Sequence, residues 1–209
     1  MAINTYASLK TTIANYLNRS DLTSYIGDFI SLTESRLNRE LRVREMVNID
    51  TSITTVASTQ SYALPSGFLE ATTVIYQSDP FKILRFISNV DFYEKYNTSQ
   101  TAGSPTYFTI VGTNILLGVA PDSAKTLQIN YYKTISSLSD SNTTNTILTN
   151  YPDLYLYGAL AESAPFIMQD DRLKTWAGLY KEALKNANES SSRGATASST
   201  LQMSAIEVV

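Results

Sequence analysis

The spacing of apolar residues changes twice along this chain, and each change limits the kind of element that can form. Up to about residue 46, apolar side chains recur every three or four positions, as on one face of a helix. From Val47 they alternate with polar residues and β-branched side chains are frequent, which favours half-buried strands. Helical spacing returns after residue 150. The sequence therefore predicts helices at both ends of the chain and strands between them.

Two helices are predicted in the N-terminal part. The first covers about Thr5 to Asn18 and has one apolar face, formed by Tyr6, Leu9, Ile13, Tyr16 and Leu17. The second begins at the possible N-caps of Ser20 to Ser24 and ends near Val43 to Met46. Its buried residues are predicted to be Ile26, Ile30, Leu37 and Leu41.

The middle of the chain is predicted to form six or seven short strands, which would make a small antiparallel sandwich or barrel. A short helix of about Asn89 to Tyr96, capped by Ser88, interrupts them. Polar turns separate the strands, beginning with Ala57 to Gln60. The predicted strands are Val47–Thr55, Ala71–Gln77, Phe81–Phe86, Tyr107–Val111, Asn114–Val119 and Thr126–Ile135.

The C-terminal part is predicted to contain a polar linker, two helices and an arm. A helix with Pro152 in its first turn is apolar over most of its surface, until Pro165 kinks or ends it. The next helix covers about Asp170 to Asn188, with a stripe that includes Trp176 and Tyr180. The polar sequence that follows cannot bury enough surface to fold alone. It is tipped with the apolar residues Leu201, Met203, Ile206, Val208 and Val209.

We expect the helices of both ends to form one helical bundle, into which an antiparallel β domain is inserted. The predicted fold class is therefore α+β with an extended C-terminal arm. Its parts are the N-terminal helices (1–46), the β-rich insertion (47–135), the linker (136–149), the C-terminal helices (150–188) and the flexible arm (189–209).

Composition excludes several classes of function. The chain has no Cys and no His, so disulfides, Cys/His zinc sites and imidazole catalysis are ruled out, and we expect no cofactor or metal. A net charge of −3 argues against nucleic-acid binding. Charged residues make up 17% of the chain, below the roughly 25% of ordinary soluble proteins. With fourteen Tyr, this surface suits a protein that packs against other subunits.

Targeting signals are not apparent in the sequence. The first residues lack the basic start and apolar run of a signal peptide. No segment approaches the ~18 consecutive apolar residues of a membrane span. We therefore expect the protein to be made and kept in the cytoplasm, without a membrane partner.

A series of residues in the N-terminal part has a recognisable type and order. It comprises Tyr6, Leu9-Lys10, Leu17-Asn18-Arg19-Ser20-Asp21-Leu22, Ile26, Asp28-Phe29-Ile30, Glu34, Arg36-Leu37-Asn38-Arg39 and Leu41-Arg42. This series resembles the N-terminal signature of the head-to-tail adaptor (connector) proteins of short-tailed bacteriophages. The later order of strands, helices and a polar tail is compatible with that family.

The resemblance implies a structural protein of the virion neck rather than an enzyme. It implies a ring of twelve copies between the portal protein and a distal tail protein (nozzle or tail tube), through which DNA passes without sequence-specific recognition. Adaptors of this family are thought to send C-terminal segments onto the portal. The arm residues Leu201, Met203, Ile206, Val208 and Val209 are therefore the candidate portal-binding site.

The arginines near residue 40 are open to more than one interpretation. The positive charge of Arg36, Arg39, Arg42 and Arg44 is nearly balanced by the negative charge of Glu34, Glu40 and Glu45. Direct DNA recognition is therefore the weakest interpretation. Arg36, Glu40 and Arg44 have the spacing of a solvated ladder on one helical face. A closed ring needs a heterologous interface, where the fixed fork of Arg suits pairing with a neighbouring subunit. The candidate interface residues are Arg36, Arg39, Glu40 and Arg42.

Two other functions remain as alternatives. The β region could be a carbohydrate-binding or tail-spike module that stacks sugars on tyrosines such as Tyr131, Tyr132, Tyr151, Tyr155 and Tyr157. A cell-wall hydrolase would need two carboxyl groups roughly 5 to 10 Å apart. Nothing in the sequence pairs the available carboxylates, which are Asp28, Glu34, Glu162, Asp170 and Asp171.

Overall fold

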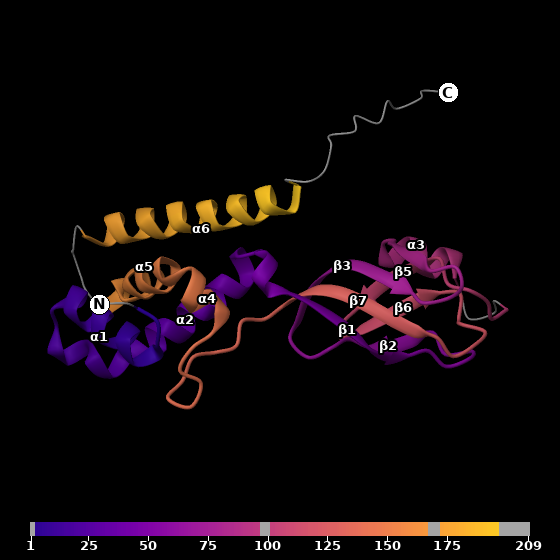
Figure 1. Cartoon of the computed structure of the whole chain (residues 1–209), viewed down its shortest axis with the longest axis horizontal. Helices are drawn as coiled ribbons and strands as arrows, with labels where there is room; N and C mark the ends of the chain where they lie inside the picture. Colours follow the sequence, from indigo (N-terminus) through magenta and orange to yellow (C-terminus); the bar gives the residue numbers. More distant parts are fainter. Residues whose placement is uncertain (1–2, 97–100, 167–171, 197–209) are drawn as a thin grey trace, which may run out of the picture. The chain divides into compact units, whose positions relative to one another are not determined.

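The computed structural model describes residues 3–96, 101–166 and 172–196, and the chain divides into two compact units (Figure 1). The helical unit consists of Met1–Glu45 and Ile135–Val209, and the β unit consists of Met46–Thr134. Both ends of the chain thus belong to one unit and the strands to the other. The predicted α+β class is confirmed by the helices and by a curled sheet of seven strands.

The helical unit contains short 3-10 turns as well as α-helices. The turns are η1 (Ser20–Tyr25), η2 (Arg44–Met46), whose last residue belongs to the β unit, and η3 (Ala164–Phe166). The α-helices are α1 (Tyr6–Leu17), α2 (Ile26–Glu40), α4 (Thr146–Asn150), α5 (Pro152–Glu162) and α6 (Arg172–Thr196).

Helix α1 begins and ends where the sequence predicts. Its N-terminus is a capping box, in which Thr5 Oγ1 accepts a hydrogen bond from the Ser8 N–H at 3.2 Å and Ser8 Oγ accepts one from the Thr5 N–H at 3.0 Å. Asn18 at the C-cap has a φ of 51°, a left-handed conformation that Asn tolerates. Of the predicted apolar face, Tyr16 is exposed and the buried members are Leu9, Ile13 and Leu17.

Helix α2 ends earlier than the sequence predicts, at Glu40, because side chains of α6 bond the backbone beyond it. Asn188 Oδ1 accepts a hydrogen bond from the Arg42 N–H at 2.9 Å. Ser191 Oγ accepts one from the Arg44 N–H at 2.8 Å. These bonds replace the helical ones, so the predicted end near Val43 to Met46 is wrong.

Helix α4 occupies the end of the segment predicted as a polar linker. Asn145 caps it by accepting a hydrogen bond from the Leu148 N–H at 2.8 Å, and Ile147 and Leu148 are buried. Helix α5 has Pro152 in its first turn, as predicted. It ends at Glu162, because Pro165 has no N–H to continue the helical pattern.

Helix α6 continues past its predicted end at Asn188 to Thr196. Residues 189–196, assigned to the arm from their Ser-rich sequence, are therefore helical. The bond from Ser191 to the Arg44 backbone is a tertiary contact that the composition of this segment could not reveal. The apolar arm residues Leu201, Met203, Ile206, Val208 and Val209 lie outside the described residues.

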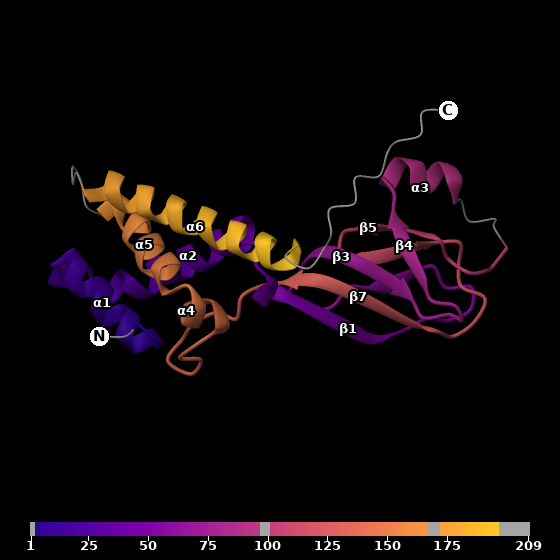
Figure 2. The same ribbon diagram turned by 45° about the horizontal axis from the view of Figure 1, so that its top comes forward.

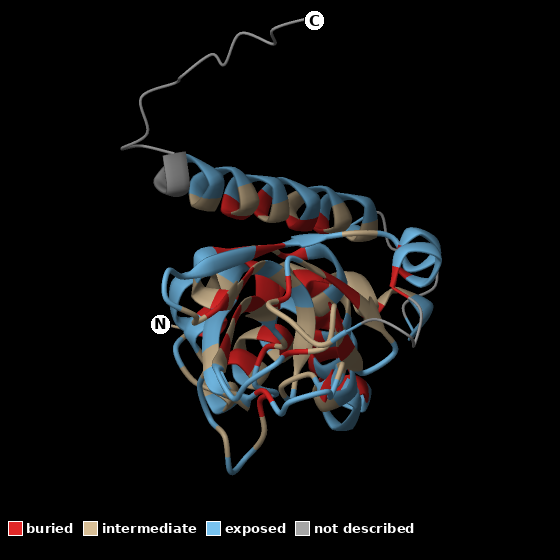
Figure 3. Cartoon of the chain, turned by 90° about the vertical axis from the view of Figure 1, so that its right-hand side faces the viewer, coloured by how far each residue is buried: buried red, intermediate tan, exposed pale blue. Residues whose placement is uncertain are grey.

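Helix α5 is the centre of the helical unit. It packs against α1, α2, α4 and α6, and Figure 2 shows it between α6 and the N-terminal helices. Gly158 permits its close approach to α2, since a Cβ at this position would clash with the Thr33 side chain. Helix α6 buries one side only (Figure 3), with Trp176, Tyr180, Ala183 and Ala187 at helical spacing.

The β unit is a single sheet with the strand order β1-β7-β3-β4-β5-β6-β2. Its neighbours are antiparallel except β4 and β5, which are parallel, so the prediction of a wholly antiparallel domain is wrong. A parallel pair needs a crossover connection, and α3 (Asn89–Lys95), capped by Ser88 as predicted, provides it. The strands are β1 (Val47–Thr54), β2 (Ser61–Ala63), β3 (Phe68–Tyr76), β4 (Lys82–Phe86), β5 (Tyr107–Val111), β6 (Asn114–Gly118) and β7 (Thr126–Lys133).

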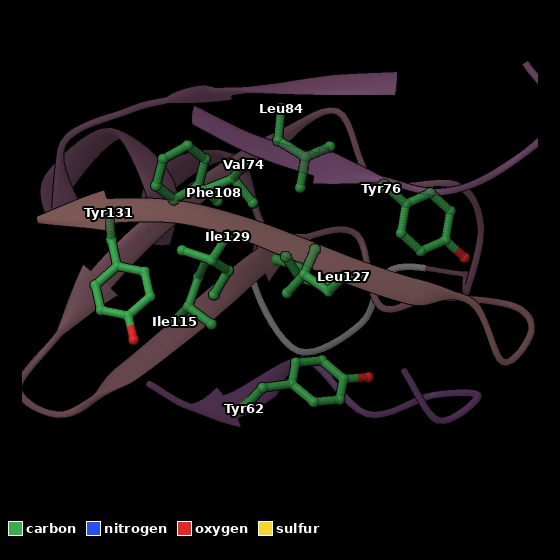
Figure 4. Packing of buried hydrophobic residues seen from close by; sticks show 10 residues of the cluster. Tyr62, Val74, Tyr76, Leu84, Phe108, Ile115, Leu127, Ile129 and Tyr131 are labelled. Carbon is green, nitrogen blue, oxygen red and sulfur yellow. The ribbon is translucent and has the colours of Figure 1, made fainter. Parts of the chain in front are cut away.

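The sheet curls around one apolar core. Tyr62 of β2 and Ile129 of β7 belong to the same buried cluster, although several strands separate them in the sheet order. Figure 4 shows their side chains in one interior with those of Val74, Leu84 and Ile115. The edge strands β1 and β2 do not pair with each other, so the sheet is curled without closing into a hydrogen-bonded barrel.

Candidate functional site

An ion-pair cluster in the helical unit joins α2, α5 and α6. Arg36 Nε lies 3.2 Å from Glu40 Oε1, and its guanidinium reaches Glu162 Oε1, also at 3.2 Å. The guanidinium carbon lies 4.5 Å from the centre of the Tyr180 ring, and the Tyr180 hydroxyl donates to Glu40 Oε2 at 3.1 Å. Burial, together with the Glu40 carboxylate, raises the pKa of Tyr180. We call these four residues the Arg36 cluster.

A second set of polar contacts fixes the end of α2 to α6. Besides accepting from the Arg42 N–H, Asn188 donates through Nδ2 to the Glu40 carbonyl at 3.3 Å. The Arg42 guanidinium turns back to the carbonyls of Leu41 and Asn38, at 2.7 and 3.1 Å. Cations and donors at a helix C-terminus satisfy its unpaired carbonyls. The α6 segment that precedes the arm is thereby held on the end of α2.

The four predicted interface residues separate into two groups. Arg36, Glu40 and Arg42 form bonds within the helical unit. Arg39 is exposed and makes no hydrogen bond or ion pair with any residue that the structure describes. The predicted ladder exists only as the Arg36–Glu40 pair, because Arg44 lies beyond the helix end and pairs with Glu45 at 3.3 Å instead.

Glu34 is the one carboxylate buried in the helical core among the described residues, with 4% of its surface exposed. Its Oε1 accepts hydrogen bonds from the Leu138 N–H at 2.8 Å and from the Tyr155 hydroxyl at 3.2 Å. Asn145 in turn donates to the Tyr155 oxygen at 2.7 Å. Burial raises the pKa of Glu34 above its ordinary value, and these donors oppose the shift. Glu34 thus ties the segment before α4 to α2 and α5.

The remaining carboxylates do not assemble a hydrolytic pair. Glu162 is bonded to Arg36, and Asp28 is exposed on α2. Asp170 and Asp171 lie outside the described residues. Within residues 3–96, 101–166 and 172–196, no three Asp or Glu side chains gather as a metal site would require.

Most tyrosines proposed for sugar stacking have structural partners. Tyr131 is buried and stacks on Phe68, with ring centres 5.5 Å apart. Tyr155 is buried against Glu34, and Tyr151 donates to Glu45 at 3.4 Å. Tyr132 and Tyr157 are half-buried. The rings therefore do not form an exposed stacking platform.

The sequence alone does not identify the residues from distant parts of the chain that contact α2 at this site. From the sequence alone, Glu162 is one of several available carboxylates, Tyr180 belongs to an apolar stripe, and Asn188 marks a predicted helix end. Helical spacing identified the face of α6 that carries Tyr180, but spacing within one helix cannot name a partner on another.

The comparisons with known proteins agree with the N-terminal resemblance. The sequence matches the SU10 adaptor protein family over residues 4–203. No curated protein matches the chain. None of the helices described is long and apolar enough to span a bilayer. The family match covers nearly all of the sequence, including both units, and the chain therefore belongs to the SU10 adaptor protein family, a family of bacteriophage head-to-tail adaptors.

Proposed function

We propose that this protein forms a ring between the portal and the tail of a short-tailed bacteriophage and lets DNA pass through it. The observation that carries the proposal is the family match over residues 4–203. The N-terminal resemblance adds the expected number of copies, twelve, and the two partners, which are the portal and a nozzle or tail-tube protein. The protein would then reside in the neck of the virion.

Arg39 supports a ring contact in the helical unit. Its guanidinium is exposed and unpaired among the described residues, whereas Arg36, Glu40 and Arg42 are engaged within the chain. An arginine fork pairs well with a carboxylate of a neighbouring copy. We therefore assign Arg39 to the subunit interface and give Arg36, Glu40 and Arg42 the task of holding α2 and α6 together.

The arm is the proposed contact with the portal. Its apolar residues follow a helix whose C-terminal half is bonded to the end of α2 through Asn188 and Ser191. Each arm would bind weakly, because fixing one conformation of a chain segment on binding costs conformational entropy. Repetition around a ring makes the combined binding strong through effective concentration. A single portal subunit would then fail to trigger assembly.

Light scattering of the protein mixed with its portal tests the proposal. The full chain should give a high-mass complex that a truncation ending at Thr196 abolishes. The truncation ends there because removal of Ser191 would disturb α2 as well as the arm. A matched full-length control changes Leu201, Met203 and Ile206 to Ser and should behave like the truncation. Absence of a complex with the full chain would overturn the adaptor role.

A further inference from the structure

A polar pocket lies in the β unit, at the end of the sheet where β3 ends and β4 and β7 begin. Its volume is about 330 Å³, which falls within the roughly 300–1,000 Å³ of small-ligand pockets. The ionisable and hydroxyl-bearing residues of its wall that matter here are Tyr76, Asp79, Lys82, Ser104, Asp122 and Lys125. We call this the Tyr76 pocket.

The sheet itself holds the walls of the Tyr76 pocket in place. Tyr76 and Lys82 stand directly opposite each other in the β3–β4 pair, so their side chains lie on the same face of the sheet. The loop before β5 is joined to the segment before β7 by the Gly103 N–H, which donates to the Ala120 carbonyl at 2.8 Å. Segments that are distant in the sequence therefore meet around one pocket.

Tyr76 forms the inner end of the pocket and brings an unpaired hydroxyl to it. With 1% of its surface exposed, it is the buried one of the six wall residues. Its hydroxyl is buried and has no hydrogen-bond partner among the described residues. Figure 4 shows this hydroxyl directed away from the apolar side chains around the ring. An acceptor atom that enters the pocket would therefore satisfy it without breaking an internal bond.

Lys82, Ser104 and Lys125 supply further donors. Lys82 Nζ donates to Ser104 Oγ at 2.7 Å, which uses one of the three N–H groups of the ammonium. Because Ser104 accepts in this bond, its own O–H is left to donate elsewhere. The Lys125 side chain makes no hydrogen bond or ion pair with the residues that the structure describes. The pocket thus needs a ligand rich in acceptor atoms.

Two carboxylates in the wall limit the charge of that ligand. Asp122 Oδ1 accepts a hydrogen bond from the Ser123 hydroxyl at 2.8 Å, and Asp79 is exposed and unpaired among the described residues. Two Lys and two Asp make the wall formally neutral, so it provides no net field that would hold a multiply charged anion. A carboxylate carries a single charge on two acceptor oxygens and fits this balance.

We propose that the Tyr76 pocket binds a carboxylate group, with the hydroxyls of Tyr76 and Ser104 and the Lys82 ammonium as donors. Hydrogen bonds to an ionised acceptor are stronger than those between neutral groups, which favours a carboxylate over an amide or a carbonyl. A small organic acid and an acidic side chain of a partner protein present the same group. The inference does not depend on the proposed ring, because one copy contains the whole pocket.

Acetate titration of the isotope-labelled full-length protein, followed by NMR at neutral pH, tests the proposal. Amide signals around the pocket should shift and saturate with sodium acetate, whereas sodium chloride at equal ionic strength should not reproduce the shifts. Tyr76→Phe removes only the hydroxyl and should weaken acetate binding roughly tenfold. Tyr131→Phe, another buried tyrosine of the same core, is the matched control and should bind acetate normally.

Charge substitutions distinguish a carboxylate from other ligands. Lys82→Gln should weaken acetate binding roughly tenfold, because a charged donor is lost. Asp79→Asn should strengthen it about threefold, because a like charge beside the site is removed. Lys133→Gln, an exposed cation of β7, is the matched charge control and should change nothing. Weaker acetate binding by Asp79→Asn would overturn the proposal, since it would show that Asp79 accepts from the ligand.

A short blocked peptide with one Glu separates the two sources of the carboxylate. Tighter binding of this peptide than of acetate, with the same loss in Tyr76→Phe, would assign the pocket to an acidic side chain of a partner protein. Equal binding would assign it to a small acid. Shifts that chloride reproduces, or acetate binding that Tyr76→Phe leaves unchanged, would overturn the inference. Thermal unfolding of Tyr76→Phe verifies that the fold is retained.

Discussion

The helical unit and the β unit differ in what they do with their charged groups. In the helical unit, Arg36 is paired with two carboxylates and the buried Glu34 accepts two hydrogen bonds. In the β unit, Arg85 and Asp50 Oδ2 have no partner among the described residues. Among the described residues, the helical unit therefore bonds its buried polar side chains internally and leaves the exposed Arg39 unpaired, whereas the β unit has a buried carboxylate oxygen without a donor.

The apolar residues follow the same division. The most exposed large apolar side chains lie in the β unit, within β4, α3 and their flanking residues. Buried polar bonds such as those of Glu34 stabilise one arrangement of the helices, because any other arrangement leaves a desolvated group unpaired. Exposed apolar groups do not stabilise the isolated chain. This contrast predicts that mutations of the helical contacts change folding and mutations of the exposed apolar residues of the β unit change assembly.

Among variants of the helical unit, Glu34→Ala should have the largest effect on folding. It leaves the Leu138 N–H and the Tyr155 hydroxyl without their acceptor inside the core, and each unsatisfied group costs about 1–3 kcal/mol. The free energy of unfolding should fall by about 3 kcal/mol in a urea titration. Glu34→Gln retains an acceptor and should lose less. An unchanged unfolding midpoint for Glu34→Ala would show that these bonds do not hold the helices together.

The pH dependence of stability sharpens the role of Glu34. Burial raises its pKa above the ordinary value of 4.5, so the folded state holds the proton to a higher pH than the unfolded state. The stability that the raised pKa of Glu34 contributes is therefore fully present below about pH 4.5 and is lost as the pH rises through that raised pKa. As the pH rises through this range, the unfolding free energy of the unmodified protein should fall relative to that of Glu34→Gln. A difference in unfolding free energy that does not change with pH would contradict the raised pKa of Glu34.

Gly158→Ala should have the next largest effect. A Cβ at this position would clash with the Thr33 side chain, so α5 and α2 would have to separate. Overpacking of this kind costs about 1–3 kcal/mol. Gly178→Ala is the matched control on α6, where a Cβ would contact nothing, and it should not reduce stability. Equal thermal unfolding of the two variants would show that the close approach of the helices is not needed.

Local signals allowed much of this fold to be predicted from the sequence. The helix α1 was predicted at both ends, since Thr5 and Asn18 lie at its caps and Leu9, Ile13 and Leu17 share one face. Helix α3 followed from the Ser88 cap, and most strands followed from alternation. These features depend on residues a few positions apart, which is the range over which periodicity and capping act.

Contacts between distant residues could not be predicted in this way. Helix α2 ends at Glu40 because Asn188 and Ser191 bond the backbone beyond it, and the same contacts accompany the helical continuation of α6. Arg36 and Glu162 are 126 residues apart in the sequence. The parallel pairing of β4 and β5 did leave a signal, because a helix predicted between two strands is the pattern of a parallel crossover.

Arg36→Ala and Arg39→Ala should separate folding from assembly within α2. Loss of Arg36 leaves Glu40 and Glu162 without their cation and removes the contact with the Tyr180 ring, at a cost of about 1 kcal/mol. Arg39→Ala should leave the unfolding free energy unchanged within about 0.5 kcal/mol and should weaken ring formation. Thermal unfolding and light scattering with the portal measure the two effects. A stability loss for Arg39→Ala would place Arg39 among the folding contacts.

Ile83→Ser should have the smallest effect on folding, although it replaces a large apolar residue. With 69% of its surface exposed, Ile83 contributes little burial to the isolated chain, so the unfolding free energy should change by less than about 0.5 kcal/mol. The neighbouring core residue Leu84, 4% exposed, is the matched control, and Leu84→Ala should cost about 2–5 kcal/mol. The exposed variant should also bind less of an apolar dye, because it exposes less apolar surface. If Ile83→Ser were as destabilising as Leu84→Ala, the exposed apolar residues of the β unit would belong to its core, and the contrast between the bonded interior of the helical unit and the exposed apolar surface of the β unit would fail.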